Sequence, residues 1–453
     1  MTPDHAVVIG ASLAGVLAAR VLADHFDRVT VVERDALPDT PEPRSGTPQA
    51  KHPHILFAGG RHAMDALVPG LSEDLVAAGA VPVVLPRDLM LRNRAGWLDR
   101  DLDDRHSRGG LHTLSFSRPL LDWAMGRRVL TLPSIETLER REVVGLLVGG
   151  GAVRGVRVRD RSTGDTGELR ADLVVDASGR TSRAPRWLSA AGLPEPRESR
   201  VTVHPGYATR VFRRAEPFGD WKSMIVLAYP GSPRGGVLLP MEGDRWIASL
   251  NGMGDDHPPT DGAGFLAFAR SLATTLLHNT IKDCEPDGPV LGFRHGDNVA
   301  RHHEKSSVDG LLVTGDAFRS FNPVHGQGMT VTATGARVLA ECLAEGLSGL
   351  APRFHRALAR SAAPAWQFAT GQDMRYPVAD GPPRRLPDRL VGRFIGRVEH
   401  AAVAGGPATR AFLEVMQMVS PPSVLFRPRV LCSVLRARPV TTAAPPLAQL
   451  SGD

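Results

Sequence analysis

The residues with the clearest chemical potential lie near the start of the chain, where a glycine turn follows a short apolar run. Residues 10–15 read Gly-Ala-Ser-Leu-Ala-Gly after the apolar residues 5–9, and residues 28–32 form a second apolar run that ends at Glu33. The helix after such a turn offers free N–H groups to a pyrophosphate, and a carboxylate at the second strand tip can accept both hydroxyls of a ribose. The pattern predicts a strand–helix–strand unit that binds a dinucleotide.

This turn departs from the G-x-G-x-x-G pattern at its middle position, which is Ser12. Gly10 permits the tight turn and Gly15 permits close packing of the helix on the sheet. Ser12 is small enough to let the backbone approach a phosphate. The alternative is a glycine turn in an α/β protein that binds no nucleotide, but the complete βαβ context and Glu33 favour the dinucleotide.

A second group of residues that could bind a ligand follows an apolar run at residues 310–314, which we expect to be a buried strand. Gly315-Asp316 ends that strand, and a loop containing Pro323, Gly326 and Gly328 opens a helix that runs to about Leu343. A strand tip with an aspartate and a glycine-rich helix start form a second site for an anion or a polar ring. Asp316 as a simple turn cap is the alternative, and both roles are compatible.

Two further polar turns belong with these sites. The apolar run 171–175 leads into Asp176-Ala-Ser-Gly-Arg180, and Arg118 stands at a helix start behind the N-cap candidate Ser117. Arg118 is placed to contact an anion, with a solvated surface arginine as the alternative. The basic loop 44–54 contains His52 and His54 without a nearby third ligand, so we interpret it as a loop over a phosphate or a redox ring and not as a metal site.

Composition limits the class of protein. The net charge is +6 with a pI near 9.7, but no compact basic block with interleaved aromatic residues occurs, so we expect no nucleic-acid partner. The three cysteines are widely spaced and form neither a metal pattern nor a disulfide framework, which favours the cytoplasm. No run of eighteen apolar residues is present, so we expect no transmembrane span. Nothing indicates the oligomeric state.

The elements that position these residues indicate an α/β (α+β) protein with Rossmann-like units and an inserted, mostly antiparallel sheet. We expect strands at 207–213, 223–228, 235–241 and 245–250, and helices at 16–23, 55–67 and 265–278. Three more helices are expected at the following ranges: 352–370 with a kink at Pro364, 388–404 and 408–418. The basic and apolar tail 427–438 is interpreted as a capping helix, with contact to a membrane or another subunit as the alternative.

The predicted division is a discontinuous dinucleotide-binding domain, a substrate-binding domain and a C-terminal helical region. The first comprises residues 1–78, 116–195 and 290–350. The second comprises 79–115 and 196–289, and the helical region comprises 351–453.

Four motifs occur in chain order: Gly10–Gly15 with Glu33 and Arg34, then Arg118, then Asp176–Arg180, then Gly315-Asp316 with Pro323 and Gly326-x-Gly328. Over residues 1 to about 345 this order resembles the single-component (group A) FAD-dependent monooxygenases of the p-hydroxybenzoate hydroxylase type. The segments 44–56, 207–210, 239–241 and 321–323 look closest to the actinobacterial flavin epoxidases of polyether antibiotic pathways, such as the lasalocid and monensin enzymes.

The resemblance implies a domain of the glutathione reductase type that binds FAD non-covalently. Glu33 and Arg34 would face the adenosine, Asp316 the ribityl chain or pyrophosphate, and the loop from Pro323 to Met329 the isoalloxazine. The full set that it implies for the cofactor is Gly10, Ser12, Leu13, Ala14, Gly15, Glu33, Arg34, Arg44, Arg118, Val143, Asp176, Gly315, Asp316, Pro323, Gly326, Gly328 and Met329. Because Ala177 and Ser178 precede Gly179, the turn departs from the family's Asp-Gly form, and a direct contact of Asp176 with NAD(P)H is not implied.

The reaction that the resemblance implies starts with NAD(P)H reducing FAD. O₂ then gives a flavin C4a-hydroperoxide, which transfers an oxygen atom to an electron-rich carbon, so neither a metal nor a catalytic triad is expected. The favoured interpretation is epoxidation of an alkene in a hydrophobic polyketide or terpenoid of secondary metabolism, such as antibiotic biosynthesis. Pocket candidates are Tyr207, Arg210, Met241 and His325, each of which ordinary packing or hydrogen bonding would explain equally well.

Three alternatives remain. An aromatic hydroxylase would use the same scaffold, and a small polar pocket would support it. A flavin-dependent reductase or halogenase is a further option, although no two tryptophans are two residues apart, as the halogenase signature W-x-W-x-I-P requires. A nucleotide-binding protein without enzymatic activity is the last.

Overall fold

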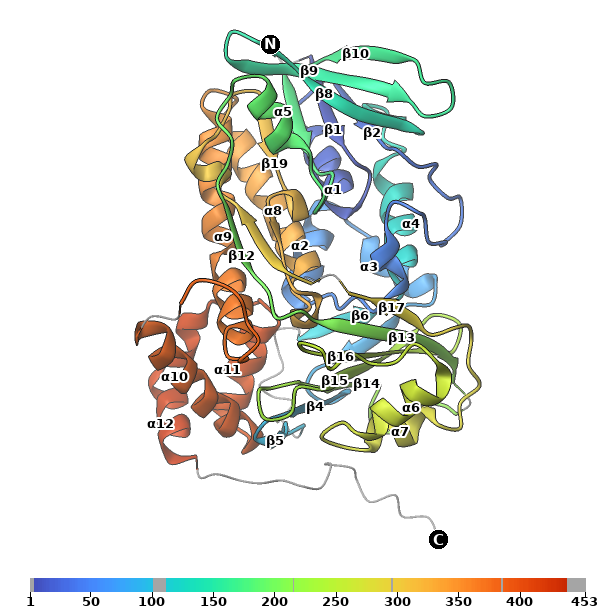
Figure 1. The fold of residues 1–453 in the computed structure, drawn as a ribbon, viewed down its shortest axis with the longest axis vertical. Coiled ribbons are helices and arrows are strands. Elements are labelled where there is room, and N and C mark those ends of the chain that lie inside the picture. The colour runs from blue at the N-terminus through green and yellow to red at the C-terminus, as the bar shows by residue number, and fades with distance from the viewer. Residues whose placement is uncertain (1–3, 101–110, 215, 295, 384–385, 438–453) are drawn as a thin grey trace.

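The part of the chain that is predicted to bind a dinucleotide is built on a parallel sheet in the upper half of the molecule (Figure 1). The computed structural model describes residues 4–100, 111–214, 216–294, 296–383 and 386–437. The strand order is β19-β11-β1-β2-β7, and every neighbouring pair is parallel. The strands are β1 His5–Ile9, β2 Arg28–Val32, β7 Ile135–Leu138, β11 Leu173–Asp176 and β19 Leu311–Val313. Apolar strands buried on both faces are typical of a parallel sheet.

The two faces of this sheet are covered differently. A layer of helices packs against one face, where α1 contacts α4 and α8 and α8 contacts α2 and α9. A three-stranded antiparallel sheet contributes Val143, Val153 and Val156 to the same core. The bounds are α1 Leu13–Leu22, α2 Ala58–Leu67, α3 Leu71–Ala77, α4 Arg118–Val129, α5 Ala184–Ala190, α8 Gly328–Ala344, α9 Leu350–Asp373, β8 Arg141–Gly149, β9 Ala152–Asp160 and β10 Thr166–Arg170.

A seven-stranded sheet forms the lower half, in the order β17-β13-β16-β15-β14-β4-β5. All its pairings are antiparallel except β14 with β4. Its strands are β4 Leu89–Asn93, β5 Gly96–Trp97, β13 Gly206–Arg213, β14 Ser223–Val226, β15 Gly235–Met241, β16 Arg245–Gly252 and β17 Leu291–Phe293. Two small sheets connect the halves, formed by β3 Val81–Val84 with β6 His112–Ser115 and by β12 Glu198–Val201, β18 Asn298–Arg301 and β20 Arg319–Ser320.

Side chains alternate between the two faces of this sheet. Ala208, Phe212 and Leu250 face α6 Gly262–Arg270 and α7 Leu276–Ile281 and share one core with them. The opposite face, which we call the inner face, carries the intervening residues, among them Tyr207, Thr209 and Val211 of β13 with their cross-strand partners Asn251, Ser249 and Ile247.

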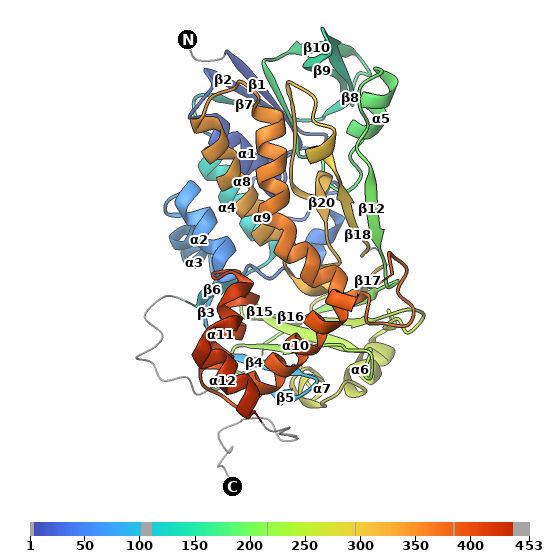
Figure 2. The same ribbon diagram turned by 90° about the vertical axis from the view of Figure 1, so that its left-hand side faces the viewer.

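The C-terminal helices cover the edge of the seven-stranded sheet near β4 (Figure 2). They are α10 Leu386–Val403, α11 Pro407–Met416 and α12 Pro428–Arg436. Val398, Phe412 and Val430 share a core with Leu89 and Leu91 of β4.

The expected fold class is confirmed, and the differences lie at element ends. The helix predicted over 265–278 is wrong: α6 ends at Arg270 and α7 starts at Leu276. Ser271 Oγ donates to the carbonyl of Phe268, and Thr274 Oγ1 accepts from the N–H of Leu276, so hydroxyl side chains compete with helical bonding between the two segments. Pro364 lies inside α9, which changes direction along its length in Figure 2.

Other expected bounds shift slightly. The helix expected from residue 55 starts at Ala58. The tail is helical over α12, while residue 438 of the expected tail and residues 101–110 lie outside the described part of the chain. The domain division remains a proposal, and because β17 pairs with β13 we now propose a boundary after Phe293 in place of 289.

Candidate functional site

The glycine turn after β1 brings backbone donors to the edge of the parallel sheet. Gly10 has a φ of +98°, and a Cβ at Gly15 would overlap the carbonyl oxygen of Gly10, so both positions need glycine. The side chain of Ser12 makes no capping hydrogen bond to α1. The first N–H groups of α1 therefore have no intrahelical partner and remain free to bind an anion.

Glu33 closes the turn from the tip of β2. Its Oε2 accepts the N–H of Ala11 at 2.7 Å and lies 3.1 Å from Nη1 of Arg44, while its Oε1 accepts the N–H of Asp35 at 3.0 Å. A carboxylate has about four acceptor positions, so Glu33 keeps capacity for a ribose hydroxyl.

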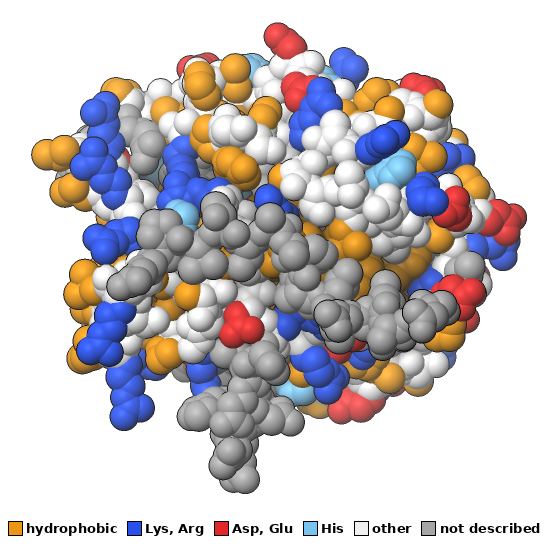
Figure 3. Space-filling view, turned by 90° about the horizontal axis from the view of Figure 1, so that it is seen from below, with side chains coloured by type: hydrophobic (Ala, Val, Ile, Leu, Met, Phe, Trp, Pro, Cys, Tyr) orange, Lys and Arg blue, Asp and Glu red, His pale blue; other side chains and the backbone are white. Residues whose placement is uncertain are grey.

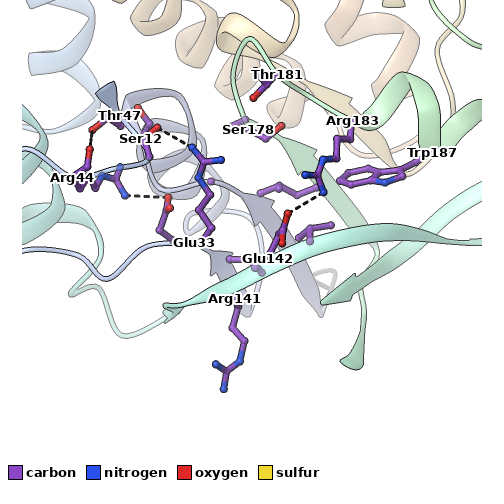
Figure 4. A pocket seen from close by; sticks show the side chains of 17 residues that line it. Ser12, Glu33, Arg44, Thr47, Arg141, Glu142, Ser178, Thr181, Arg183 and Trp187 are labelled. Atoms are coloured by element: carbon purple, nitrogen blue, oxygen red, sulfur yellow. Dashed lines mark hydrogen bonds and ion pairs between the residues drawn. The ribbon is translucent and has the colours of Figure 1, made fainter. Parts of the chain in front are cut away.

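A cavity opens between this turn, β8 and the turn after β11 (Figure 4). Two ion pairs line the cavity, Arg44 with Glu33 and Arg183 with Glu142. The expected cofactor residues Gly10, Ser12, Glu33, Arg34, Arg44 and Val143 line it. Thr47 of the loop 44–54 also lines it, as do Arg183 and Trp187 at α5. Sequence reasoning did not name these three residues, because no motif marks them.

Arg118 lies at the start of α4 beside the glycine turn. Its Nη2 donates to Ser12 Oγ at 3.0 Å, and its Nε donates to Asp122 at 2.9 Å. Ser117 caps α4 by accepting the N–H of Leu120, as the sequence predicted. A buried guanidinium beside Ser12 adds positive charge where α1 begins, which suits a pyrophosphate.

The expectation that Asp176 contacts the cofactor does not fit its surroundings. Its Oδ1 accepts the N–H and the hydroxyl of Ser178, and its Oδ2 accepts the hydroxyl of Ser182. The carboxylate is fully buried and holds its own turn together. Ala177, Ser178 and Thr181 reach the cavity instead.

Gly315 and Asp316 bring the second motif against the first. Gly315 has a φ of +58°, and an added Cβ would lie 2.6 Å from the Cβ of Ala14. Asp316 has solvent-accessible surface, but many protein atoms surround its carboxyl, and this partial desolvation raises the pKa of the carboxyl. The positive charges of Arg180, Arg118 and Arg301 oppose that rise. Such a group gains from hydroxyl donors, as a ribityl chain would supply.

The loop before α8 is held by a buried polar network. Tyr207 donates its hydroxyl to Oδ1 of Asn322 and accepts the N–H of Val324. Burial, aided by Asp373, raises the pKa of Tyr207, so the phenol stays protonated and able to donate. This contact ties the inner face of the seven-stranded sheet to the loop.

Asp373, the last residue of α9, is the centre of this network. It is only 1% exposed, and its carboxylate accepts hydrogen bonds from the amides of Asn298 and Asn322 and from Nε2 of His325. Sequence reasoning nominated His325 but missed Asp373, because nothing in the local pattern distinguishes it from a solvated acid at a helix end.

The start of α8 offers further unpartnered groups. The Gln327 side chain makes no capping hydrogen bond to α8. Two buried oxygen atoms, Oε1 of Gln327 and Oγ1 of Thr330, have no hydrogen-bond partner among the described residues. Gly326 has a φ of +68°, and an added Cβ at Gly328 would meet nothing within 4 Å. Met329 is buried in the main core. Pro323 begins the short turn before Gly326.

The pocket candidates separate by face. Tyr207 and Met241 lie on the inner face, where Met241 packs with Leu239, Ile247 and Ile55. Arg210 was expected in the same pocket, and this is corrected: strand alternation places it on the opposite face, where its Nε donates to the carbonyl of Gly288 and its guanidinium lies over Phe212.

Free N–H groups at α1 and α8, the open acceptor capacity of Glu33 and the Asp316 carboxyl all suit a dinucleotide that carries a polar ring. A family model described as "FAD binding domain" matches residues 4–360. The chain belongs to this family. It is an FAD-dependent enzyme of the monooxygenase type, and its mixed α/β fold is the one used by flavin-dependent monooxygenases and halogenases.

Two relatives align with most of the chain. Protein Rv3254 of Mycobacterium tuberculosis is 33% identical, with 98% of each chain covered. The 6-methylpretetramide 4-monooxygenase of Streptomyces rimosus is 27% identical over 80% of this chain and 81% of its own length. Among solved structures, the flavin-dependent brominase Bmp2 superposes with a TM-score of 0.65 at 15% identity, covering 91% of this chain and 94% of that one, which shows a shared fold.

In this family member the FAD would lie with its adenosine in the Glu33 cavity and its ring toward the loop before α8. Within the described residues no helix combines the length and apolar character needed to span a bilayer. No group of three or more His, Cys, Asp or Glu side chains there is arranged to hold a metal, and the absence of a metal remains a prediction.

Proposed function

We propose that the enzyme uses FAD and NAD(P)H to epoxidise an alkene of a large hydrophobic polyketide or terpenoid. The observation that carries this proposal is the apolar part of the inner face, which is formed by Val211, Leu239, Met241 and Ile247. Ile55, from the loop before α2, packs against them. Val211 lies on the same strand, β13, as Tyr207, whose hydroxyl bonds Asn322 in the loop before α8. The apolar part of the inner face is therefore connected to that loop. An apolar wall favours a substrate whose reacting part lacks charge.

The reduced flavin, when bound, supplies the activated oxygen. The chain's own residues then have three tasks. The inner face orients the substrate and excludes water. Asp373 and Tyr207 hold the loop before α8 in place. His325 uses its Nε2 to bond Asp373. Its other ring nitrogen, Nδ1, is then available to accept or return a proton near the flavin ring.

An aromatic hydroxylase is the second candidate. The similarity to the Streptomyces rimosus 6-methylpretetramide 4-monooxygenase supports it, and so does the polar end of the inner face. There Asn251 is buried beside Tyr207, and its Nδ2 has no hydrogen-bond partner among the described residues. A phenol or carbonyl oxygen of an aromatic polyketide would satisfy that donor.

The test is turnover by the purified, FAD-loaded protein. NADH and NADPH oxidation are each followed with a panel of apolar alkenes and polycyclic phenols, and products are identified by mass. Epoxide formation supports the first proposal, and hydroxylated arenes alone replace it with the second. Met241→Gln serves as the site variant, and Arg210→Gln, on the opposite face, as its matched control. A protein that takes up no FAD contradicts both.

A further inference from the structure

The C-terminal helices and the segment between α11 and α12 carry the most exposed large apolar side chains of the described residues. Nine large apolar side chains are exposed among the described residues, and the five most exposed lie between residues 386 and 435, at 54% to 70% exposure. These five are Leu386, Leu390, Val391, Phe426 and Leu435. We call them the apolar set. Clustered exposure of this kind marks an interaction site, whereas single exposed apolar residues are ordinary.

The apolar set lies on elements that pack together. The ring of Phe426 stacks on Phe394 of α10 at a centroid distance of 4.8 Å. Val398 of α10 and Val430 and Val434 of α12 are buried in the core that these helices share. The helices are therefore anchored through one side and present Leu390 and Leu435 from another. The exposed side chains are not remnants of an unfolded tail.

Arginines accompany the apolar set. Six exposed arginines lie on the same segments: Arg389, Arg393, Arg397, Arg427, Arg429 and Arg436. Asp388 is the one exposed acid among the described residues 386–436, because Glu399 and Glu414 are half-buried and pair with Arg94 and Arg410. Seen from below, blue and orange side chains alternate along the left edge of the molecule (Figure 3).

We propose that α10, Phe426 and α12 dock onto the surface of an anionic lipid bilayer. Helices that lie in a membrane interface combine apolar side chains with Arg-rich flanks, and each basic residue near an anionic surface strengthens binding about fivefold. A second copy of this chain is a poorer occupant, because a face-to-face dimer would bring two arginine-rich surfaces together. The docking is peripheral. It is independent of the proposed function, since none of these residues lines the cofactor cavity.

The first experiment measures co-sedimentation of the FAD-loaded full chain with phosphatidylglycerol-containing vesicles and with pure phosphatidylcholine vesicles. We expect binding to the anionic vesicles, at least tenfold weaker binding to phosphatidylcholine, and release at high salt. The double variant Arg429→Glu with Arg436→Glu should lose at least tenfold in affinity, and so should Phe426→Ser with Leu435→Ser. Arg154→Glu with Val148→Ser, an exposed pair on β8 and β9, is the matched control.

A second readout uses Cys432, which is exposed on α12, whereas Cys342 is buried. In a Cys284→Ser background, a polarity-sensitive dye on Cys432 should shift to shorter wavelengths with anionic vesicles. Absence of binding overturns the proposal, as does binding that the variants leave unchanged. Concentration-dependent dimers that the same variants abolish would assign the surface to a second copy instead. Flavin absorbance of each variant reports folding separately, so failure here leaves the proposed oxygenase function untouched.

Discussion

The Oδ1 atom of Asp373 lies 2.9 Å from Nε2 of His325, which joins the end of α9 to the loop before α8. The same carboxylate accepts the amides of Asn298 and Asn322. A residue outside the segment matched by the family model thus organises the loop that would face the flavin ring. The helical region after residue 360 therefore contributes to the site.

Replacing Asp373 with Leu should strongly destabilise the protein. Three buried donors would lose their acceptor, and each unsatisfied donor costs about 1–3 kcal/mol. Asp373→Asn should lose less stability, yet it should still weaken the orientation of His325. Urea unfolding measures the first effect, and the pH dependence of turnover measures the second. Glu341→Gln, an exposed acid on α8, should change neither. A pH profile unaltered by Asp373→Asn would contradict the role assigned to the pair.

Gly15→Ala should destabilise the fold and reduce FAD content. The added methyl would overlap the carbonyl of Gly10, and backbone on both sides would have to move. We expect a loss of about 1–3 kcal/mol, as for overpacking that displaces backbone. Gly371→Ala is the control, because a Cβ there meets nothing within 4 Å inside α9 and should stabilise by about 0.5–1 kcal/mol. Thermal unfolding with and without FAD distinguishes the two.

Glu33→Gln should weaken FAD binding by about 10- to 100-fold. Removing the charge leaves Arg44 buried without its ion pair and weakens acceptance of ribose hydroxyls, a loss of roughly 1.5–3 kcal/mol. Quenching of FAD fluorescence during titration of the apoprotein measures the affinity. Glu136→Gln, on the exposed side of the neighbouring β7, should bind FAD like the parent chain. Equal affinities for all three proteins would place the adenosine elsewhere.

Acid should destabilise the protein through His303. Burial, together with the nearby charge of Arg301, lowers the pKa of this imidazole to about 3. Because the unfolded state binds the proton near pH 6.5, stability is full above that pH and falls as the pH drops toward 3, by up to about 1.4 kcal/mol per pH unit. His303→Phe, which retains a ring beside Phe318, should flatten this slope between pH 6 and 4. His112→Gln, an exposed control, should leave it unchanged. Urea unfolding across pH gives the slopes.

Local sequence patterns were sufficient to predict the first strands of the parallel sheet and the glycine turn between them. Gly10, Gly15 and Glu33 are read from a single βαβ unit, because the steric need for glycine and the position of a strand tip are local properties. The resemblance drawn from the sequence rests on these residues and on Gly315-Asp316, which follow them in chain order. The interruption between α6 and α7 was missed because hydroxyl side chains broke a helix whose apolar spacing continued.

Only the tertiary structure decided which distant side chains meet. Asp373 reaches His325 from 48 residues away, and Tyr207 reaches Asn322 across 115 residues. Asp176 turned out to hold its own turn, and Arg210 lies on the outer face of its sheet, because burial and strand register depend on what packs against each element. Local spacing determines what a segment can form, whereas contacts between segments determine which of its polar groups remain free for chemistry.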